Sequence, residues 1–561
     1  MRQNRRATML KTSLLTAALL AVGQAAFAQP PVGLGGQIQQ IPPAPAPRNS
    51  IPDIRIERQP TPVGPAPGGP KLLVRSVHVT GETLFSEADL IAATDFHPGA
   101  ELDLSQLREM AAKISGYYNR RGYFVAQAYL PAQDIQDGVV TITVIEGRYD
   151  KVRLRNASNL SDRVANDVLG GLNHGDVVAT APLERRLLLL SDVPGVQVRS
   201  TLAPGGAVGT TDLLVDLTQG RSVSGSLEAD NAGNRYTGAG RVGATVNLND
   251  PLGLGDVASV RVLTSGPGLV YVRGSYQLQL RDATVGVAYA RLQYRLGREF
   301  SSLHASGTEG IASLYGSYPL IRSRNDNLYA SVDADDRVFE DDIALTAMRT
   351  NKRAEVLTFG LNGNHHDGLG GGGWSSFSLS GSVGDLNLRT PAMRATDAAS
   401  ARTQGQYGKL TFAADRLQTL SGPLSLYGQI RGQLASKNLD ISEKMELGGA
   451  YGVRAYPEGE AYGDEGYVAT LEARLLLPAA ELPGRVQLFG FVDAGAVRIA
   501  KTPWLAGPNI LKRSGAGAGA TWAANNNFLV RASYAWRLGD VPATSGPDSA
   551  GRLWVEIVKF F

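Results

Sequence analysis

The chain has 561 residues, carries a formal charge of +3 and contains no cysteine. This length exceeds that of one ordinary compact domain, and the absence of cysteine excludes disulfides as a source of stability. The charge gives no argument for a nucleic-acid partner, because four basic and no acidic residues lie within residues 1–28. Removing those four positive charges from +3 leaves −1.

Residues 1–28 have the pattern of a secretory signal peptide. Arginines precede a mostly apolar run from Met9 to Val22, and Ala26-Phe27-Ala28 fits a cleavage site, so we expect cleavage before Gln29. The run is short for a membrane-spanning helix, which needs about 20 residues. No later apolar run of that length occurs in the sequence. If the mature chain crosses a membrane, it must therefore do so as a closed barrel, which satisfies all backbone hydrogen bonds.

Residues 29–70 contain 12 of the 29 prolines. Proline removes amide donors and favours extended backbone, so this stretch is predicted to be a linker. A helix is disfavoured there, except around residues 51–59.

Two stretches follow, 71–148 and 149–220, with the same predicted order of elements, β-α-α-β-β. In the first, "LLVRSVHVTG" is strand-like, Leu107, Ala111 and Ile114 have helical spacing, and "VVTITVIEG" is strand-like. The second repeats this order from "KVRLRN" to "TDLLVDLTQG". The repetition predicts two small α+β units in tandem.

Residues 221–561 are rich in glycine and alternate in polarity over segments of about ten residues. In "VYVRGSYQLQL", Val270 and Val272 lie on one face, and Arg273 and Ser275 lie on the other. This period of two places one face on lipid and the other in a polar lumen. A soluble β-sandwich is the alternative, but about 340 residues without a break favour a transmembrane barrel. At roughly 21 residues per strand and connection, about 16 strands are expected.

The connections between predicted strands, counted back from the C-terminus, alternate between long and short. Short turns face the periplasm in such barrels, so the connection 448–466 is expected to start on the outer side. It carries a single arginine, Arg454, and strand parity places Asp493 and Glu472 in the lumen. Because an enclosed arginine requires a carboxylate, we expect the loop to fold inward and Arg454 to pair with Asp493, with Glu472 as a competing partner.

Five stretches carry a family resemblance. They are Gly122–Val152, Asp192–Leu217, Asp230–Asp256, Ser317–Asp335 and "GVRAYPEGEAYGDEGY", Gly452–Tyr467. In this order they resemble the outer-membrane transporters of two-partner secretion, the haemolysin and filamentous-haemagglutinin exporters. That family is similar to the outer-membrane barrel insertase and shares its superfamily. The resemblance implies a mainly β fold, with two α+β POTRA domains before a 16-stranded transmembrane β-barrel.

The resemblance also implies roles for individual residues. The loop motif is expected at Val453, Arg454, Ala455 and Tyr456, with a wall partner at Asp493 inside "FVDAG", which runs from Phe491 to Gly495. Phe561 ends the last strand and resembles the assembly signal of bacterial barrels. Ala455 stands where the family motif has glycine, and alanine is costly there if the backbone requires a positive φ.

The function implied is a translocation pore in the bacterial outer membrane, with its POTRA domains in the periplasm. It would export an unfolded partner exoprotein and itself depend on membrane lipid, periplasmic chaperones and the barrel assembly machinery. The alternative is an insertase for other barrels. We expect neither an enzyme nor a cofactor. The sequence has no phosphate-binding glycine-lysine motif. The adjacent histidines His365 and His366 lack the spacing of metal ligands and are predicted to lie in a loop.

Overall fold

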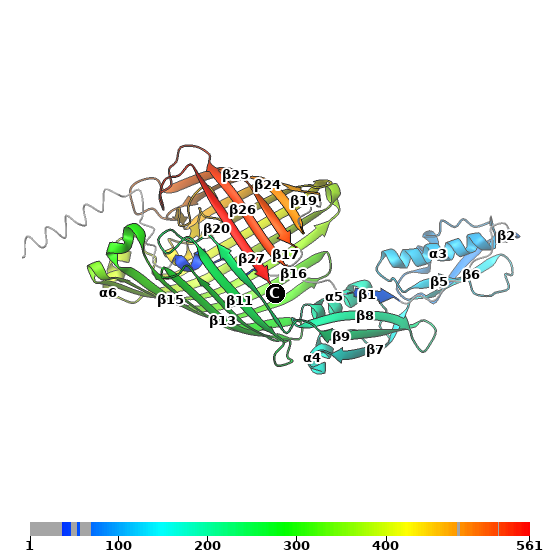
Figure 1. Cartoon of the computed structure of the whole chain (residues 1–561). Coiled ribbons are helices and arrows are strands. Elements are labelled where there is room, and N and C mark those ends of the chain that lie inside the picture. Colours follow the sequence, from blue (N-terminus) through cyan, green and yellow to red (C-terminus); the bar gives the residue numbers. More distant parts are fainter. Residues whose placement is uncertain (1–35, 46–52, 57–68, 479–482, 525–526) are drawn as a thin grey trace, which may run out of the picture.

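The computed structural model describes residues 36–45, 53–56, 69–478, 483–524 and 527–561. The predicted signal peptide and most of the predicted linker lie outside these residues. Figure 1 shows a large barrel with two small units at one of its ends. Within the described part of the chain, no helix is both long and apolar enough to span a membrane.

The first small unit packs two helices on a three-stranded sheet of order β3-β6-β5. Its longest helix, α3, starts with a capping box, because Asp103 and Gln106 exchange hydrogen bonds of 2.9 Å between side chain and backbone. The buried face of α3 contains Leu107, Ala111 and Ile114 at helical spacing. The elements are β2 (Leu72–Val74), β3 (Ser76–Thr80), α2 (Glu87–Ala92), β4 (Ala100–Leu102), α3 (Leu104–Arg120), β5 (Gln127–Tyr129) and β6 (Val139–Ile145).

The second small unit has the predicted order β-α-α-β-β and one additional strand. That strand, β1 (Asp53–Ile56), comes from the proline-rich stretch and pairs in parallel with β8. Residues 53–56, within the stretch 51–59 where a helix was not excluded, thus form a strand, and the rest of that stretch lies outside the described residues. The other elements are β7 (Arg148–Ala157), α4 (Asp162–Leu169), α5 (Thr180–Ser191), β8 (Val196–Pro204) and β9 (Thr210–Gln219). The sheet order is β1-β8-β9-β7.

The barrel is closed and antiparallel, with 16 strands, as predicted. The first and last strands close it: Ser226 to Asp230 pair with Phe560 to Glu556. The strands are β10 (Val223–Asp230), β11 (Arg241–Asn249), β12 (Val257–Thr264), β13 (Leu269–Leu280), β14 (Ala283–Arg295), β15 (Ala305–Arg322), β16 (Asp326–Ile343), β17 (Met348–Asp367), β18 (Gly373–Leu388), β19 (Gly405–Ser421), β20 (Leu424–Ala435), β23 (Glu465–Leu476), β24 (Arg485–Arg498), β25 (Ile510–Ala524), β26 (Phe528–Arg537) and β27 (Gly551–Phe560).

Shorter elements lie in the connections. They are η1 (Gln37–Gln40), η2 (Arg298–Leu303), η3 (Ala344–Thr346), η4 (Leu369–Gly371), α6 (Pro391–Ala398), η5 (Ile441–Glu443), β21 (Met445–Glu446) and β22 (Tyr462–Gly463). The pair His365-His366 lies inside β17 and not in a loop, so that prediction is wrong. His365 there contacts Asp326 of the neighbouring strand.

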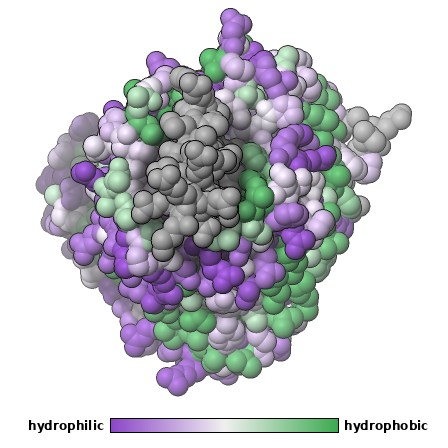
Figure 2. All heavy atoms as spheres, turned by 90° about the vertical axis from the view of Figure 1, so that its left-hand side faces the viewer, coloured by the Kyte–Doolittle hydropathy of each residue, from purple (hydrophilic) through white to green (hydrophobic). Residues whose placement is uncertain are grey.

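The two faces of the barrel wall follow the predicted alternation. Val270 and Val272 are each 40% exposed, whereas Tyr271 between them is 7% exposed because its side chain points into the filled lumen. Seen from the end away from the small units, polar residues surround the mouth and apolar ones cover the visible flank (Figure 2). The C-terminus lies at the end next to the small units (Figure 1), as expected for a periplasmic end.

Helix α5 fastens the second unit to the rim of the barrel. Arg185 and Arg186 both reach the Asp282 carboxylate in the β13–β14 turn, at 3.1 and 2.8 Å. Asp192, just after the helix, accepts a two-pronged bond of 2.7 and 2.8 Å from Arg322 at the end of β15. Since such paired bonds fix orientation, the second unit is held in a defined position over this part of the mouth.

Candidate functional site: an inward loop bound to the barrel wall

The connection between β20 and β23 turns back into the lumen. The short strands β21 and β22 pair at its base, and backbone bonds such as Val453 N to Leu447 O (2.9 Å) make its tip compact. Val453 and Tyr456 at the tip are at most 1% exposed and pack in one apolar cluster with Phe489 and Phe491 of β24. The loop around residues 448–466 therefore lies inside the barrel, against the wall.

Arg454 sits at the centre of this contact. Its Nε and Nη2 donate to the two oxygens of Asp493 at 2.8 and 2.7 Å, and its backbone N–H donates to the same carboxylate at 3.1 Å. Its Nη1 donates to Glu472 at 2.8 Å. Glu472 is therefore a second partner of the same guanidinium rather than a competitor. Asp493 is fully buried, so the pair is held away from solvent.

The wall is shaped to receive the arginine. The centroid of the Phe491 ring lies 3.4 Å from the Arg454 Cζ, which is a stacked cation–π contact. Trp554 of β27 donates its indole N–H to the Arg454 carbonyl at 2.7 Å. Gly495 leaves room for the loop, because a side chain there would meet Leu447 and the backbone of β23.

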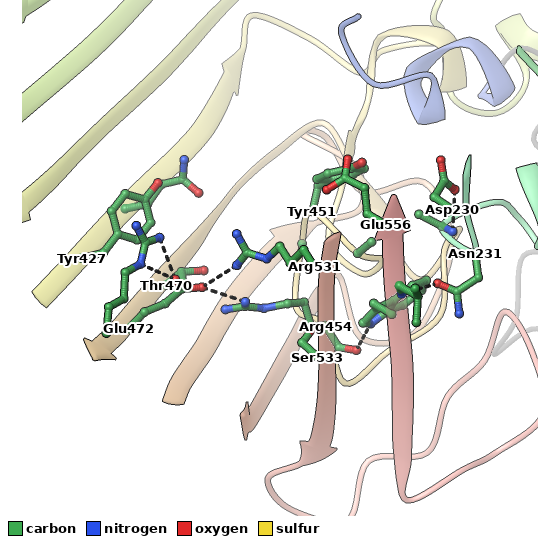
Figure 3. A pocket seen from close by; sticks show the side chains of 17 residues that line it. Asp230, Asn231, Tyr427, Tyr451, Arg454, Thr470, Glu472, Arg531, Ser533 and Glu556 are labelled. Carbon is green, nitrogen blue, oxygen red and sulfur yellow. Dashed lines mark hydrogen bonds and ion pairs between the residues drawn. The ribbon is translucent and has the colours of Figure 1, made fainter. Parts of the chain in front are cut away.

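Glu472 joins three arginines on the lumen wall. Besides Arg454, it accepts two bonds from Arg474 at 2.9 and 2.7 Å and one from Arg531 at 3.2 Å. Figure 3 shows Arg454 and Arg531 pointing toward Glu472. A cavity of about 200 Å³ lies beside them, between the loop tip and the strands β23, β26, β27 and β10.

Ala455 is accommodated without backbone strain. It is not among the described non-glycine residues with positive φ, which in this loop include Ala461 at 56°. The cost expected for alanine at this position therefore does not arise. Its methyl group packs against Gly515 of β25, where a Cβ would overlap it. Tyr456 beside it donates from its hydroxyl to the Val541 carbonyl at 3.0 Å, across to the β26–β27 connection.

Sequence reasoning missed a second ion pair in the loop. Glu460 is fully buried and accepts bonds of 3.0 and 2.6 Å from Arg513 on β25. It also accepts from the backbone and hydroxyl of Thr544 in the β26–β27 connection. The repeat "GAGAGAT" was an available sequence signal for a loop docked on β25. Its alternating glycines, Gly515 and Gly517 among them, line the lumen face against which the loop packs.

Residues 36–45, within the stretch predicted as a linker, also lie in the lumen; whether residues 29–70 plug the pore was a question that the sequence left open. Gln40 donates to the Tyr462 hydroxyl of the loop at 2.7 Å, and its carbonyl accepts from Arg241 of β11 at 2.9 Å. Gln39 donates to the Ile441 carbonyl at 3.0 Å. The segment thus bridges the loop connection and the wall at β11.

Phe561 lies at the closing seam. Its backbone exchanges two hydrogen bonds of 3.1 Å with Gly225, just before the paired part of β10. The ring packs over Gly225 and is 41% exposed. An aromatic residue thus ends the last strand at the periplasmic rim.

Two family models match the chain. Residues 209–521 match the haemolysin secretion/activation proteins ShlB/FhaC/HecB, and residues 72–147 match the ShlB-type POTRA domain. The chain belongs to this family. It is an outer-membrane transporter of two-partner secretion, a family of exporters, with its barrel in the outer membrane and its POTRA region in the periplasm. The first small unit is therefore a POTRA domain.

Curated relatives agree over most of the chain. The heme/hemopexin transporter protein HuxB of Haemophilus influenzae strain 86-028NP is 29% identical over 472 residues, 82% of each chain. The outer membrane transporter CdiB of Dickeya dadantii is 24% identical over 442 residues, 76% of each chain. The structure of CdiB from Escherichia coli has the same fold, with a TM-score of 0.70, 20% identity, and coverage of 90% of this chain and 93% of that one.

Proposed function

We propose that the inward loop is a latch that closes the exporter at rest and must leave the barrel wall during transport. The observation that carries this is the single guanidinium of Arg454, bound to carboxylates on two adjacent wall strands, β23 and β24. Burial of the pair makes the docked loop a defined state, since separating a buried ion pair is costly. Residues 36–45 support the same closure from the other side of the lumen.

Capture of the exoprotein belongs to the periplasmic units, which we assign to residues 71–148 and 149–220, ahead of the barrel at 221–561. An unfolded chain binds exposed sheet edges by strand addition, where main-chain hydrogen bonds supply affinity. In the second unit, β1 already pairs with the β8 edge, whereas β7 is the opposite edge of the sheet. The edges β3 and β5 bound the sheet of the first unit. The bound chain then enters the barrel as the loop rearranges.

The proposal assigns no catalytic residue and no cofactor. Lipid surrounds the apolar outer face, and assembly uses periplasmic chaperones and the barrel assembly machinery, with Phe561 as the recognition residue. The test is deletion of the gene, with the culture medium and the outer membrane compared before and after. Loss of one large secreted protein from the medium supports the exporter. General depletion of other barrel proteins would instead show an insertase.

A further inference from the structure

Two arginines project from the outer face of β14. Val272 of β13 faces lipid, and Arg291 lies directly opposite it in the register. Opposite residues of an antiparallel pair share one face of the sheet, so Arg291 also faces outward. Arg295 has the same parity, whereas Leu292 and Tyr294 between them are buried on the lumen side. Both arginine side chains are exposed.

The two arginines lie near the outer edge of the membrane. β14 starts after the turn at Asp282, which α5 binds at the periplasmic end. With a rise of about 3.4 Å per residue and a tilt of about 40°, Arg291 lies roughly 20 Å and Arg295 roughly 30 Å above that turn. The apolar band of such barrels is about 25 Å tall, so the two positions lie on either side of its outer edge. Closer to the periplasm, the same face carries Val287 and Tyr289, each 54% exposed.

Neither arginine has a partner within the part of the chain that the structure describes. No side-chain hydrogen bond or ion pair joins Arg291 or Arg295 to another described residue. By contrast, Arg349 of β17 on the same outward face binds Asp342 at 3.2 Å. On the side of Arg291 away from β13, the register places Gly310 of β15, which has no side chain to cover the guanidinium. Two guanidinium groups at the lipid boundary are therefore free to bind an anion of the membrane.

A hollow of about 480 Å³ opens beside Arg295 on this outer face. The lining side chains that can donate hydrogen bonds are Gln293, Arg295, Ser306, Thr308 and Arg349. Two outward carboxylates of β16 also line the hollow, and both already accept hydrogen bonds. Arg349 donates to Asp342 at 3.2 Å, and Asn351 donates to Glu340 at 3.3 Å. The hollow therefore offers donors to an anionic headgroup above an apolar surface.

We propose that Arg291 and Arg295 bind the phosphates of the glycolipid in the outer leaflet of the outer membrane, the lipid A part of lipopolysaccharide. Guanidinium groups bind phosphate oxygens through paired, charge-assisted hydrogen bonds. The two arginines are four residues apart on one face, which is about 14 Å along the strand. This spacing fits a disaccharide headgroup with a phosphate at each end better than it fits one phosphate. The acyl chains then lie on Val287 and Tyr289.

This inference goes beyond the proposed export function and does not depend on it. Native mass spectrometry of the full chain, solubilised in detergent and stripped of lipid, tests it. The probes are lipid A with two phosphates, lipid A with one phosphate, and inorganic diphosphate. The variant Arg291→Gln/Arg295→Gln removes both guanidinium groups. Its matched control, Arg221→Gln/Arg281→Gln, removes two exposed arginines at the periplasmic end of the barrel. The heat-dependent electrophoretic mobility of each variant verifies that its barrel is folded.

The unchanged chain and the periplasmic control should bind lipid A with two phosphates equally well. In Arg291→Gln/Arg295→Gln the affinity should fall at least about tenfold, the loss expected for one hydrogen bond to a charged group. Lipid A with one phosphate should bind the unchanged chain more weakly than lipid A with two. Equal affinity of the two double variants would overturn the proposal, as would an unchanged chain that binds no lipid A. Displacement of lipid A by an equal concentration of diphosphate would also overturn it, because the site would then bind a free anion.

Discussion

Replacing Arg454 by alanine removes the single cation that links the loop to two wall carboxylates. Asp493 would keep only Thr470 and the backbone N–H of residue 454 as partners, while Glu472 would keep two arginines. Asp493 is fully buried, so an uncompensated charge remains in the lumen wall. Breaking such a buried pair costs about 3–5 kcal/mol. That weakens loop docking roughly a hundredfold to several thousandfold, because about 1.4 kcal/mol corresponds to a factor of ten.

The rate of thiol labelling reports this change. Ala455 is fully buried at the loop tip, between the loop and the wall, so a cysteine placed there reacts only when the loop leaves the wall. We expect the Arg454→Ala/Ala455→Cys chain to react with an externally added maleimide faster than the Ala455→Cys chain by about that factor. The labelling rate of the Arg454→Lys/Ala455→Cys chain should fall between these two rates, because lysine keeps the charge but cannot form the two parallel hydrogen bonds of a guanidinium.

Arg498 provides the matched control. It pairs with Glu465 at 2.6 Å in the same region, but its side chain is 44% exposed. Exposed pairs contribute about 0–1 kcal/mol, so Arg498→Ala should change labelling little. Equal labelling rates with and without Arg454 would refute the reasoning, because the tip would then be held by apolar packing alone.

Two further predictions concern the periplasmic units. Asp282→Asn removes the carboxylate shared by Arg185 and Arg186, and hydrogen bonds to charged groups contribute about 1.5–3 kcal/mol. Amide exchange in α5 should therefore accelerate while β9 stays unchanged; unchanged α5 exchange would contradict the docking role. Burial raises the pKa of Glu146, but hydrogen bonds from the Thr83 hydroxyl and backbone outweigh burial and hold that pKa below its ordinary 4.5. Its contribution to stability is present above pH 4.5 and is lost as the pH falls through the lowered pKa. Glu146→Gln should remove the contribution of this carboxylate to acid unfolding, which near-ultraviolet circular dichroism measures as a function of pH. An acid transition identical to that of the unchanged chain would contradict this role of Glu146.

Strand positions and the lumen face could be predicted because they depend on local alternation. The apolar residues Val270 and Val272 indicate the lipid-facing side of their strand without further information. On the strand of Asp493, the same alternation places this carboxylate inside the barrel without knowledge of its partner. Arg454 is a single cation in a loop whose ends are set by neighbouring strands. Its approach to Asp493, 39 residues away, followed from the barrel topology and the family resemblance together.

Contacts without a local pattern could not be predicted. Gln40 meets Tyr462 across 422 residues, and a proline-rich stretch has no periodicity that would place it in a lumen. Strand β1 is four residues long and forms only by adding to β8, so its conformation depends on the second unit. The Glu460–Arg513 pair needs a loop path that the sequence does not specify.

The central claim is that the loop must leave the wall for export. A reversible cross-link made by a short bis-methanethiosulfonate between Ala455→Cys and Ala535→Cys tests it most directly, because these fully buried alanines of loop and wall share one apolar cluster and the chain has no other cysteine. Free-thiol titration shows whether the cross-link has formed. Secretion of the exoprotein should stop in the cross-linked double variant, return after reduction, and remain normal in both single variants. Full secretion by the cross-linked chain would contradict the account.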